Sequence, residues 1–252
     1  MSYAFLDHPG PLPYAHRGGA LEGLENTMPA FEAAIALGYR YLETDARVTA
    51  DGVLLAFHDD DLSRTCGRPG LISELPWSEV KTARVGGKEP IPLMEDVLGT
   101  FSDRRINLDA KSDAGVAPMI EVIRRTGSLE RVCVGAFTDR RLAEVRAALG
   151  PKLCTSMGPY EVARWLAASF LPGGLGMPKV PVAQVPLTKG PVPIVTAWSV
   201  RAAAAKGIQV HVWTIDDAAE MERLLDLGVR GIITDRPHVL KEVLQRRGQW
   251  FE

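Results

Sequence analysis

Two carboxylates in one strand-forming stretch are the first residues of this sequence that could do chemistry. Glu43 and Asp45 are two positions apart in residues 41–48, so a strand there projects both to the same side. Two such carboxylates repel each other unless a positive group lies between them. A hard divalent cation, Mg²⁺ or Ca²⁺, prefers oxygen ligands, so the pair predicts a metal site. A solvated strand with alternating charges would show the same pattern, and this alternative stays open for the pair alone.

Other reactive residue types stand where further apolar stretches end. These residues are His16, Arg17, His58, Asp109 and Lys111, with Trp213 in a later stretch. Asp109 would add a third oxygen ligand to a metal that polarises a phosphoryl oxygen. Arg17 offers a planar fork for phosphate, and Lys111 adds a point charge. His16 and His58 could divide the two proton transfers, so the set predicts phosphodiester cleavage.

Each of these assignments has a structural alternative. The pair His16 and Arg17 could cap a helix or form salt bridges, and His58 could make an ordinary structural hydrogen bond. Asp109 and Lys111, again two apart, could form an internal ion pair. Trp213 is predicted to contact substrate, although core packing would account for it as well.

Around these residues the sequence alternates between predicted strands and helices. The predicted strands are residues 12–15, 41–48, 105–111, 132–137, 152–157, 182–187, 209–215 and 231–234. The predicted helices are residues 27–37, 93–100, 116–125, 139–149, 160–170, 196–206, 217–227 and 237–247. Such alternation is typical of parallel strands joined by right-handed crossovers. Eight units in 252 residues predict an α/β fold of the closed (β/α)₈ TIM barrel type, whose chemistry lies at the carboxyl ends of the strands.

One stretch interrupts the alternation. Residues 59–92 are punctuated by glycine and proline, and only residues 77–80 suggest a helical turn. The stretch is too short for an independent domain. We therefore expect a single domain over residues 1–252, with a small insertion at 59–92 after the second barrel strand.

Composition narrows the class of protein. The net charge of −2 gives no case for a nucleic-acid partner, and no apolar run reaches the ~18 residues of a membrane span, so we expect no stable membrane insertion. The first residues lack the pattern of a signal peptide. Three cysteines without metal-like spacing indicate reduced thiols in a cytoplasmic protein. The expected partner is a small-molecule substrate, and the sequence is compatible with a homodimer.

Several segments, in order, resemble a known family. They are HRGG, ENTMPAF, GYRYLETDARVTADG, FHDDDLSRTCG, ELPW, IPLMEDVL, INLDAKS, VWTID and GVRGIITDRP, within residues 13–237. They resemble the glycerophosphodiester phosphodiesterase family. The resemblance implies a TIM barrel with a small insertion, a bound Mg²⁺ or Ca²⁺, and hydrolysis of glycerophosphodiesters to sn-glycerol 3-phosphate and an alcohol. In the usual mechanism of the family, the neighbouring glycerol hydroxyl attacks phosphorus and displaces the alcohol. This step gives a cyclic phosphate, which water then opens.

The resemblance also assigns residues. It makes His16 and His58 the acid-base pair, Arg17 a phosphate contact, and Glu43 and Asp45 metal ligands. Asp109 stands where most members of the family have glutamate. The related phospholipase D toxins have aspartate at this position, so the substrate is left open. The alternatives are lysophospholipase D-like cleavage, with residues 171–182 as an apolar path for a fatty chain, and a non-catalytic barrel that binds phosphate esters.

Overall fold

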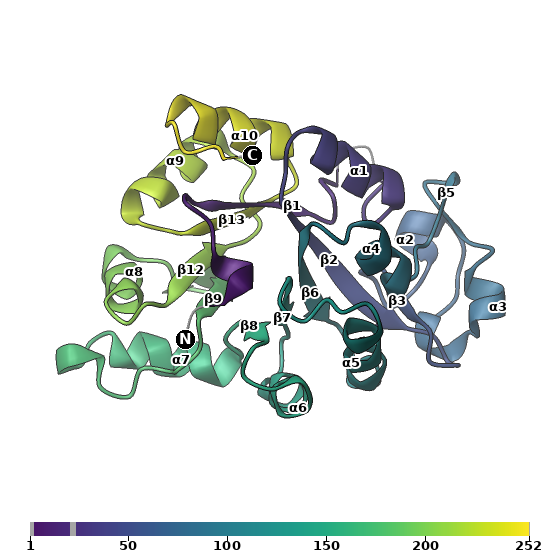
Figure 1. Ribbon diagram of the computed structural model, residues 1–252, viewed down its shortest axis with the longest axis horizontal. Coiled ribbons are helices and arrows are strands. Elements are labelled where there is room, and N and C mark those ends of the chain that lie inside the picture. Colours follow the sequence, from purple (N-terminus) through teal and green to yellow (C-terminus); the bar gives the residue numbers. More distant parts are fainter. Residues whose placement is uncertain (1–2, 21–23, 252) are drawn as a thin grey trace.

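The computed structural model describes residues 3–20 and 24–251, and a ring of parallel strands forms its centre (Figure 1). The ring follows the order β8-β7-β6-β2-β1-β13-β12-β9, and a parallel bridge between Ser156 and Val182 brings its two ends together. The eight strands are β1 (Leu12–His16), β2 (Tyr41–Val48), β6 (Arg105–Ala110), β7 (Val132–Gly135), β8 (Cys154–Thr155), β9 (Val182–Val185), β12 (Gln209–Val212) and β13 (Gly231–Thr234). The predicted (β/α)₈ barrel is therefore confirmed.

A helix follows each barrel strand and packs outside the ring (Figure 1). These helices are α1 (Met28–Ala36), α4 (Met94–Thr100), α5 (Val116–Arg125), α6 (Asp139–Leu149), α7 (Pro159–Ala168), α8 (Ala197–Ala204), α9 (Ala218–Leu227) and α10 (Pro237–Arg246). Side-chain oxygens of Thr27, Thr138, Thr196 and Asp217 accept hydrogen bonds from backbone N–H groups in the first turns of α1, α6, α8 and α9. These caps fix where the four helices begin.

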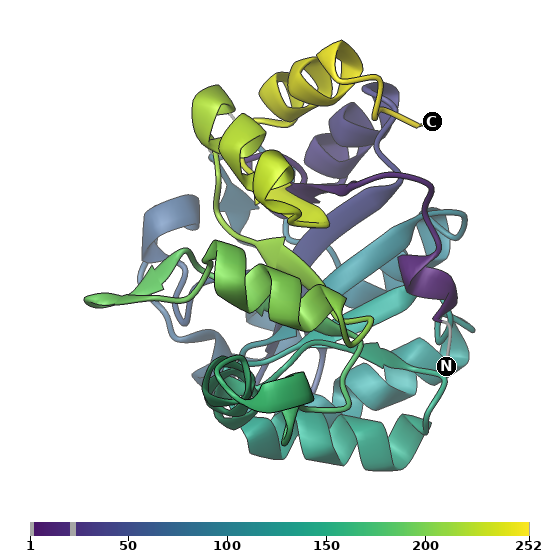
Figure 2. The same ribbon diagram turned by 90° about the vertical axis from the view of Figure 1, so that its left-hand side faces the viewer.

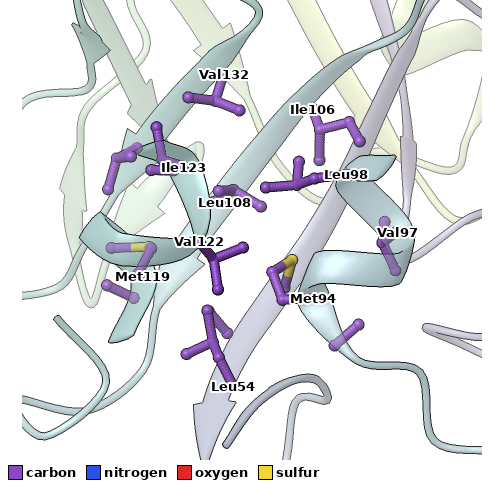
Figure 3. Packing of buried hydrophobic residues seen from close by; sticks show 14 of the residues in the cluster. Leu54, Met94, Val97, Leu98, Ile106, Leu108, Met119, Val122, Ile123 and Val132 are labelled. Carbon is purple, nitrogen blue, oxygen red and sulfur yellow. The ribbon is translucent and has the colours of Figure 1, made fainter. Parts of the chain in front are cut away.

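Apolar side chains on the outer face of the strands pack against the helices. Figure 3 shows this between β6, α4 and α5, where Ile106 and Leu108 of the strand meet Met94, Leu98 and Ile123. All five are fully buried. Alternate residues of β6 therefore face outward into this core, and its remaining residues face the barrel interior.

Aromatic side chains fill the amino-terminal end of the barrel. Phe5 of η1 (Ala4–Leu6) packs edge-on against Tyr41, whose hydroxyl donates to the Phe5 carbonyl at 2.9 Å. His211 is fully buried beside the Tyr14 hydroxyl, 3.2 Å away. A Cβ at Gly231 would lie 2.5 Å from the His211 ring, so this position must be glycine. The interior is therefore packed at this end, and open space is found at the other.

The insertion forms a small lobe beside β2 (Figure 1). It begins after β3 (Leu54–Ala56), antiparallel to β2, and contains α2 (Ser63–Cys66), η3 (Ile72–Glu74), α3 (Trp77–Val80), β4 (Arg84–Val85) and β5 (Glu89–Pro90). The turn predicted at residues 77–80 is confirmed, whereas the other short elements were not predicted. Figure 2 shows this lobe and the hairpin of β10 (Thr188–Lys189) and β11 (Val192–Pro193) at the end of the barrel opposite η1.

Two sequence expectations concern the cysteines and the membrane. Cys66, Cys133 and Cys154 are all free thiols, and the last two are buried in adjacent strands. Within residues 3–20 and 24–251, every helix is too short or too polar to cross a bilayer.

Candidate active site

Strand register brings the predicted residues together at the carboxyl ends of the strands. His16 of β1 pairs with Glu43 of β2, and Glu43 pairs in turn with Asn107 of β6. One layer further along, Asp45 of β2 pairs with Asp109 of β6. Because residues two apart face the same side, all five side chains project into the barrel.

These side chains line a cavity of about 600 Å³. Its lining includes every site residue predicted from the sequence, namely His16, Arg17, Glu43, Asp45, His58, Asp109, Lys111 and Trp213. Trp213 packs edge-on against Phe137 with ring centroids 5.8 Å apart. Its indole therefore forms a cavity wall.

His16 is held by the carboxylate of Asp235, which directly follows the last strand of the barrel. Its Nδ1 lies 2.6 Å from Asp235 Oδ1, and its Nε2 lies 3.7 Å from Glu43 Oε2. A carboxylate accepts, so Nδ1 carries the proton and Nε2 is left as the acceptor. Burial lowers the pKa of His16, but the charges of Glu43 and Asp235 outweigh burial and raise it overall. The ring is therefore oriented, and its protonated form is stabilised.

His58 is held through a chain of charged groups. Its Nδ1 donates to Asp59 at 2.7 Å, and Arg64 Nε donates to the other oxygen of Asp59 at 2.6 Å. The same guanidinium donates to both oxygens of the buried Glu25, at 2.6 and 2.8 Å. The His58 side chain itself is one-third exposed. The insertion therefore supplies the groups that orient this second imidazole.

Arg17 lies between three carboxylates. Its Nη1 donates to Glu25 at 2.9 Å, its Nε lies 3.1 Å from Asp45, and its backbone N–H donates to Glu43 at 3.2 Å. Its backbone adopts the left-handed conformation, with φ of 54°, and its carbonyl accepts from the Asn26 N–H at 2.9 Å. The turn after β1 therefore places the guanidinium inside the cavity beside Asp45.

Lys111 lies between the two carboxylates of the outer layer, Asp45 and Asp109. Its Nζ lies 2.8 Å from Asp45 and 2.5 Å from Asp109. Burial opposes the ammonium charge, but Asp109 and Asp45 raise the pKa of Lys111 overall. Burial also raises the pKa of Asp45, yet Lys111 and Arg17 outweigh it and lower that pKa. Lys111 and Asp45 are thus both charged.

Glu43 and Asp109 remain poorly compensated. Burial and the neighbouring Asp45 charge raise the pKa of Glu43 to about 7. Burial raises the pKa of Asp109 more than Lys111 lowers it, and its buried Oδ1 has no hydrogen-bond partner. Over residues 3–20 and 24–251, no three His, Cys, Asp or Glu side chains are already arranged around a metal position. The donor chemistry of Glu43 and Asp109 nevertheless fits a hard cation, since both would gain from added positive charge.

Four further residues belong to the site but were not assigned to it from the sequence. They are Glu25, Asn26, Arg64 and Asp235. Asn26 is of a residue type that often caps helices, but Thr27 caps α1, and the buried Asn26 amide donates to Asp45 at 2.9 Å. Asp235 directly follows the last predicted strand, where a polar residue is expected to be functional, but the sequence alone assigned it no role.

The contacts proposed as structural alternatives also exist. His16 and Arg17 form salt bridges, His58 forms a hydrogen bond, and Lys111 pairs with Asp109. All of these contacts surround one cavity. These contacts fix the orientation of the side chains. They do not prevent the same side chains from acting on a substrate in the cavity.

The cavity also has many apolar lining residues, which we call its apolar half. They come mainly from α7 and from the segment around the β10–β11 hairpin, whose Lys189 also lines the cavity, and they include Met157, Pro159, Val162, Ala163, Leu166, Val185, Pro186, Val192 and Ile194. Residues 171–182 were predicted to form an apolar path, but among the described residues none of that segment lines the cavity. The prediction was wrong, because α7 and the hairpin supply this wall.

Comparisons with known proteins identify the family of the chain. The model of the family described as glycerophosphoryl diester phosphodiesterase matches residues 16–239. The Mycobacterium tuberculosis protein named "Probable glycerophosphodiester phosphodiesterase 2" is 39% identical over 251 residues, which cover 98% of this chain and 95% of that protein. The human protein named "Lysophospholipase D GDPD1" is 28% identical, with 91% and 85% of the two chains covered.

A solved structure gives the same fold. The phosphodiesterase of Oleispira antarctica, solved with the product sn-glycerol-3-phosphate, superposes with a TM-score of 0.80 at 22% identity. The match covers 97% of this chain and all of that chain. The chain therefore belongs to the glycerophosphoryl diester phosphodiesterase family, and it is an enzyme of that class.

Proposed function

We propose that this enzyme hydrolyses glycerophosphodiesters to sn-glycerol 3-phosphate and an alcohol. The observation that carries the proposal is the convergence of two imidazoles, a guanidinium and buried carboxylates on one cavity. A phosphodiester is an anion whose cleavage needs charge stabilisation and two proton transfers. The name of the Mycobacterium tuberculosis relative supports the same substrate class.

In this proposal His16 and His58 divide the proton work. His16 acts as base, since its Nδ1–H donates to Asp235 and leaves Nε2 as the acceptor. His58 acts as acid and protonates the departing alcohol, while Asp59 holds its Nδ1. Because both rings are positioned by carboxylates, little reorganisation is needed when a proton moves.

Arg17 and Lys111 are proposed to bind the phosphate. Both side chains line the cavity, and both are held beside Asp45. A guanidinium contacts two phosphate oxygens at once, and an ammonium stabilises the charge that builds up at phosphorus. Trp213 would form the wall against which the substrate lies.

Glu43, Asp45 and Asp109 are proposed to hold one divalent cation, Mg²⁺ or Ca²⁺. The support is the unpartnered Asp109 oxygen and the raised pKa of Glu43, which both indicate a deficit of positive charge. When bound, the cation would polarise a phosphoryl oxygen. Asp109 is one methylene shorter than the glutamate that the resemblance gives to most family members, so it would reach the cation differently or through water.

The nucleophile in this proposal belongs to the substrate. The glycerol hydroxyl next to the diester attacks phosphorus, the bond to the alcohol oxygen breaks, and His58 supplies its proton. Water then opens the cyclic phosphate that remains. A glycerophosphodiester analogue without that hydroxyl should not be cleaved, and equal rates for both compounds would exclude internal attack.

The direct experiment follows glycerophosphocholine by phosphorus NMR, with and without chelator. We expect sn-glycerol 3-phosphate as the product, loss of turnover with chelator, and recovery with Mg²⁺ or Ca²⁺. No turnover with any metal would contradict the proposed substrate, whereas full activity in chelator would contradict only the proposed metal.

A second candidate is lysophospholipase D-like cleavage. The apolar half of the cavity, formed by residues such as Val162, Leu166 and Ile194, favours it because a fatty chain needs apolar walls. The human relative carries this name. The ratio of rates on lysophosphatidylcholine and glycerophosphocholine distinguishes the two candidates.

Three expectations about the whole molecule stay predictions. We propose that residues 1–252 form one domain that includes the insertion at 59–92. We also propose a cytoplasmic location on the basis of the free thiols Cys66, Cys133 and Cys154. A homodimer is compatible with the sequence, and analytical ultracentrifugation would detect it.

A further inference from the structure

Four large apolar side chains are exposed where α7 ends and α8 begins. Phe170 is 76% exposed, Leu171 48%, Leu175 74% and Trp198 52%, and we call these residues the α7–α8 patch. α7 and α8 lie side by side in the ring of helices (Figure 1). Single exposed apolar residues are common on proteins, but a group of large ones marks a surface that is covered in use.

The patch is held in place by specific contacts. The Phe170 and Trp198 rings stack with centroids 6.2 Å apart, and the indole N–H of Trp198 donates to the Ser169 carbonyl. The loop that carries Leu175 contains η4 (Pro172–Gly174), and Arg164 donates to the Gly176 carbonyl at 2.9 Å. The apolar side chains are therefore presented outward from an ordered surface.

The segment that carries the patch has charges of a single sign. Residues 162–215 contain no Asp or Glu, although the whole chain has a net charge of −2. The basic residues of this segment are Arg164, Lys179, Lys189, Arg201 and Lys206. Arg201 is three residues after Trp198 on α8, and Lys206 lies beside the loop at Gly174. Residues 162–215 therefore carry a net positive charge, although the net charge of the whole chain is negative.

We propose that the α7–α8 patch docks on the surface of an anionic lipid bilayer or micelle. Aromatic and aliphatic side chains insert into the boundary between headgroups and acyl chains, where tryptophan is especially favoured. Each nearby Lys or Arg adds about 1 kcal/mol of attraction to an anionic leaflet. The surface described here combines both features.

The same helix connects the patch with the cavity. Pro159, Val162 and Leu166 of α7 line the cavity, and Phe170 lies two residues beyond the end of this helix at Ala168. Docking here would place the apolar wall of the cavity next to the lipid surface. The docking itself does not depend on the proposed function, because vesicle binding is measured without turnover.

A second copy of the chain is a less suitable occupant. A twofold interface would place each α7–α8 patch against its own equivalent. Arg201 and Lys206 of the two copies would then approach each other without a carboxylate from residues 162–215 between them. Such like-charge contact disfavours association, whereas an anionic leaflet favours it.

Vesicle sedimentation tests the proposal with phosphatidylcholine vesicles, with and without phosphatidylglycerol. We expect binding only to the anionic vesicles, and weaker binding in high salt. The double variant F170S/L175S should bind at least about tenfold more weakly, because two apolar anchors are lost. The double variant R201E/K206E should also bind more weakly. L71S is the matched control, since Leu71 is an exposed leucine of the insertion, 42% exposed.

All variants should hydrolyse a small water-soluble diester at the wild-type rate, which shows that they are folded. The proposal is overturned if the wild-type protein does not bind anionic vesicles, or if F170S/L175S binds them as tightly as L71S. It is also overturned if ultracentrifugation shows a wild-type dimer that F170S/L175S converts to a monomer, because a second copy then covers the patch.

Discussion

His16 and Asp235 are 219 residues apart in the sequence, and their Nδ1 and Oδ1 atoms lie 2.6 Å apart. β1 pairs directly with β13, so closure of the barrel creates this contact between the first and last strands. The carboxylate fixes which His16 nitrogen carries the proton. The proposed base is therefore oriented only when the whole barrel has formed.

Replacing Asp235 with asparagine should lower kcat about tenfold to a hundredfold. The amide cannot impose one tautomer on His16, so Nε2 is less often available as the acceptor. KM should change little, because Asp235 does not line the cavity. Steady-state kinetics measure both constants, and D103N is the control, since the Asp103 side chain is 72% exposed. A wild-type kcat in D235N would remove Asp235 from the site.

Replacing Arg64 with alanine should lower kcat about tenfold. Arg64 donates hydrogen bonds to both Asp59 and Glu25. Asp59 in turn orients His58, and Glu25 orients Arg17. R64K should recover only part of the activity, because a single ammonium cannot contact both oxygens of Asp59 and both oxygens of Glu25 as the guanidinium does. R68A is the matched control, since Arg68 lies in the same lobe and donates to the exposed Thr82. Equal kcat values for R64A and R68A would contradict a positioning role.

Replacing Lys111 with methionine should lower the free energy of unfolding by about 3 kcal/mol, because buried Asp45 and Asp109 lose their shared cation. If these carboxylates bind a metal, Mg²⁺ or Ca²⁺ should restore part of that loss. Urea unfolding with and without metal measures both effects. K152M is the control, since Lys152 pairs with Glu130 on the exposed surface. A destabilised K111M that no divalent ion restores would argue against the metal site.

His211 should make the enzyme sensitive to acid. Burial, assisted by the charge of Arg230, lowers the pKa of His211 from 6.5 to about 3. Between pH 6.5 and about 3, His211 binds a proton in the unfolded chain but stays neutral in the folded protein. The free energy of unfolding therefore falls as the pH drops below about 6.5. Between pH 6 and 4, the free energy of unfolding should fall less steeply in H211Q than in the wild type. The difference between the two slopes should be ~1.4 kcal/mol per pH unit. H238Q, at an exposed histidine, should keep the wild-type slope.

The fold and the central site residues could be predicted because local patterns determine them. Glu43 and Asp45 must face one side of β2 wherever that strand lies, and eight strand-helix units leave few alternatives to a barrel. Some strands were predicted to be longer than they are, as at residues 152–157, because strand-forming residues continue into the loops. Only Cys154–Thr155 remain in the ladder of β8.

The supporting contacts could not be predicted because they depend on the path of the chain between elements. Arg64 reaches Glu25 only because the insertion folds back over the turn after β1. Asn26 resembles a helix cap in sequence, and only its left-handed backbone, with φ of 56°, turns its amide toward Asp45. Asp235 needs barrel closure to reach His16. Spacing in the sequence carries no signal for such contacts.

The most direct test is the release of sn-glycerol 3-phosphate from glycerophosphocholine by H16A and H58A beside the wild-type enzyme. Both variants should unfold at nearly the wild-type urea concentration, since both side chains lie at an open cavity. We expect kcat to fall at least about a hundredfold in each variant, as for the loss of a general acid or base. Near wild-type turnover in either folded variant would contradict the two-histidine site.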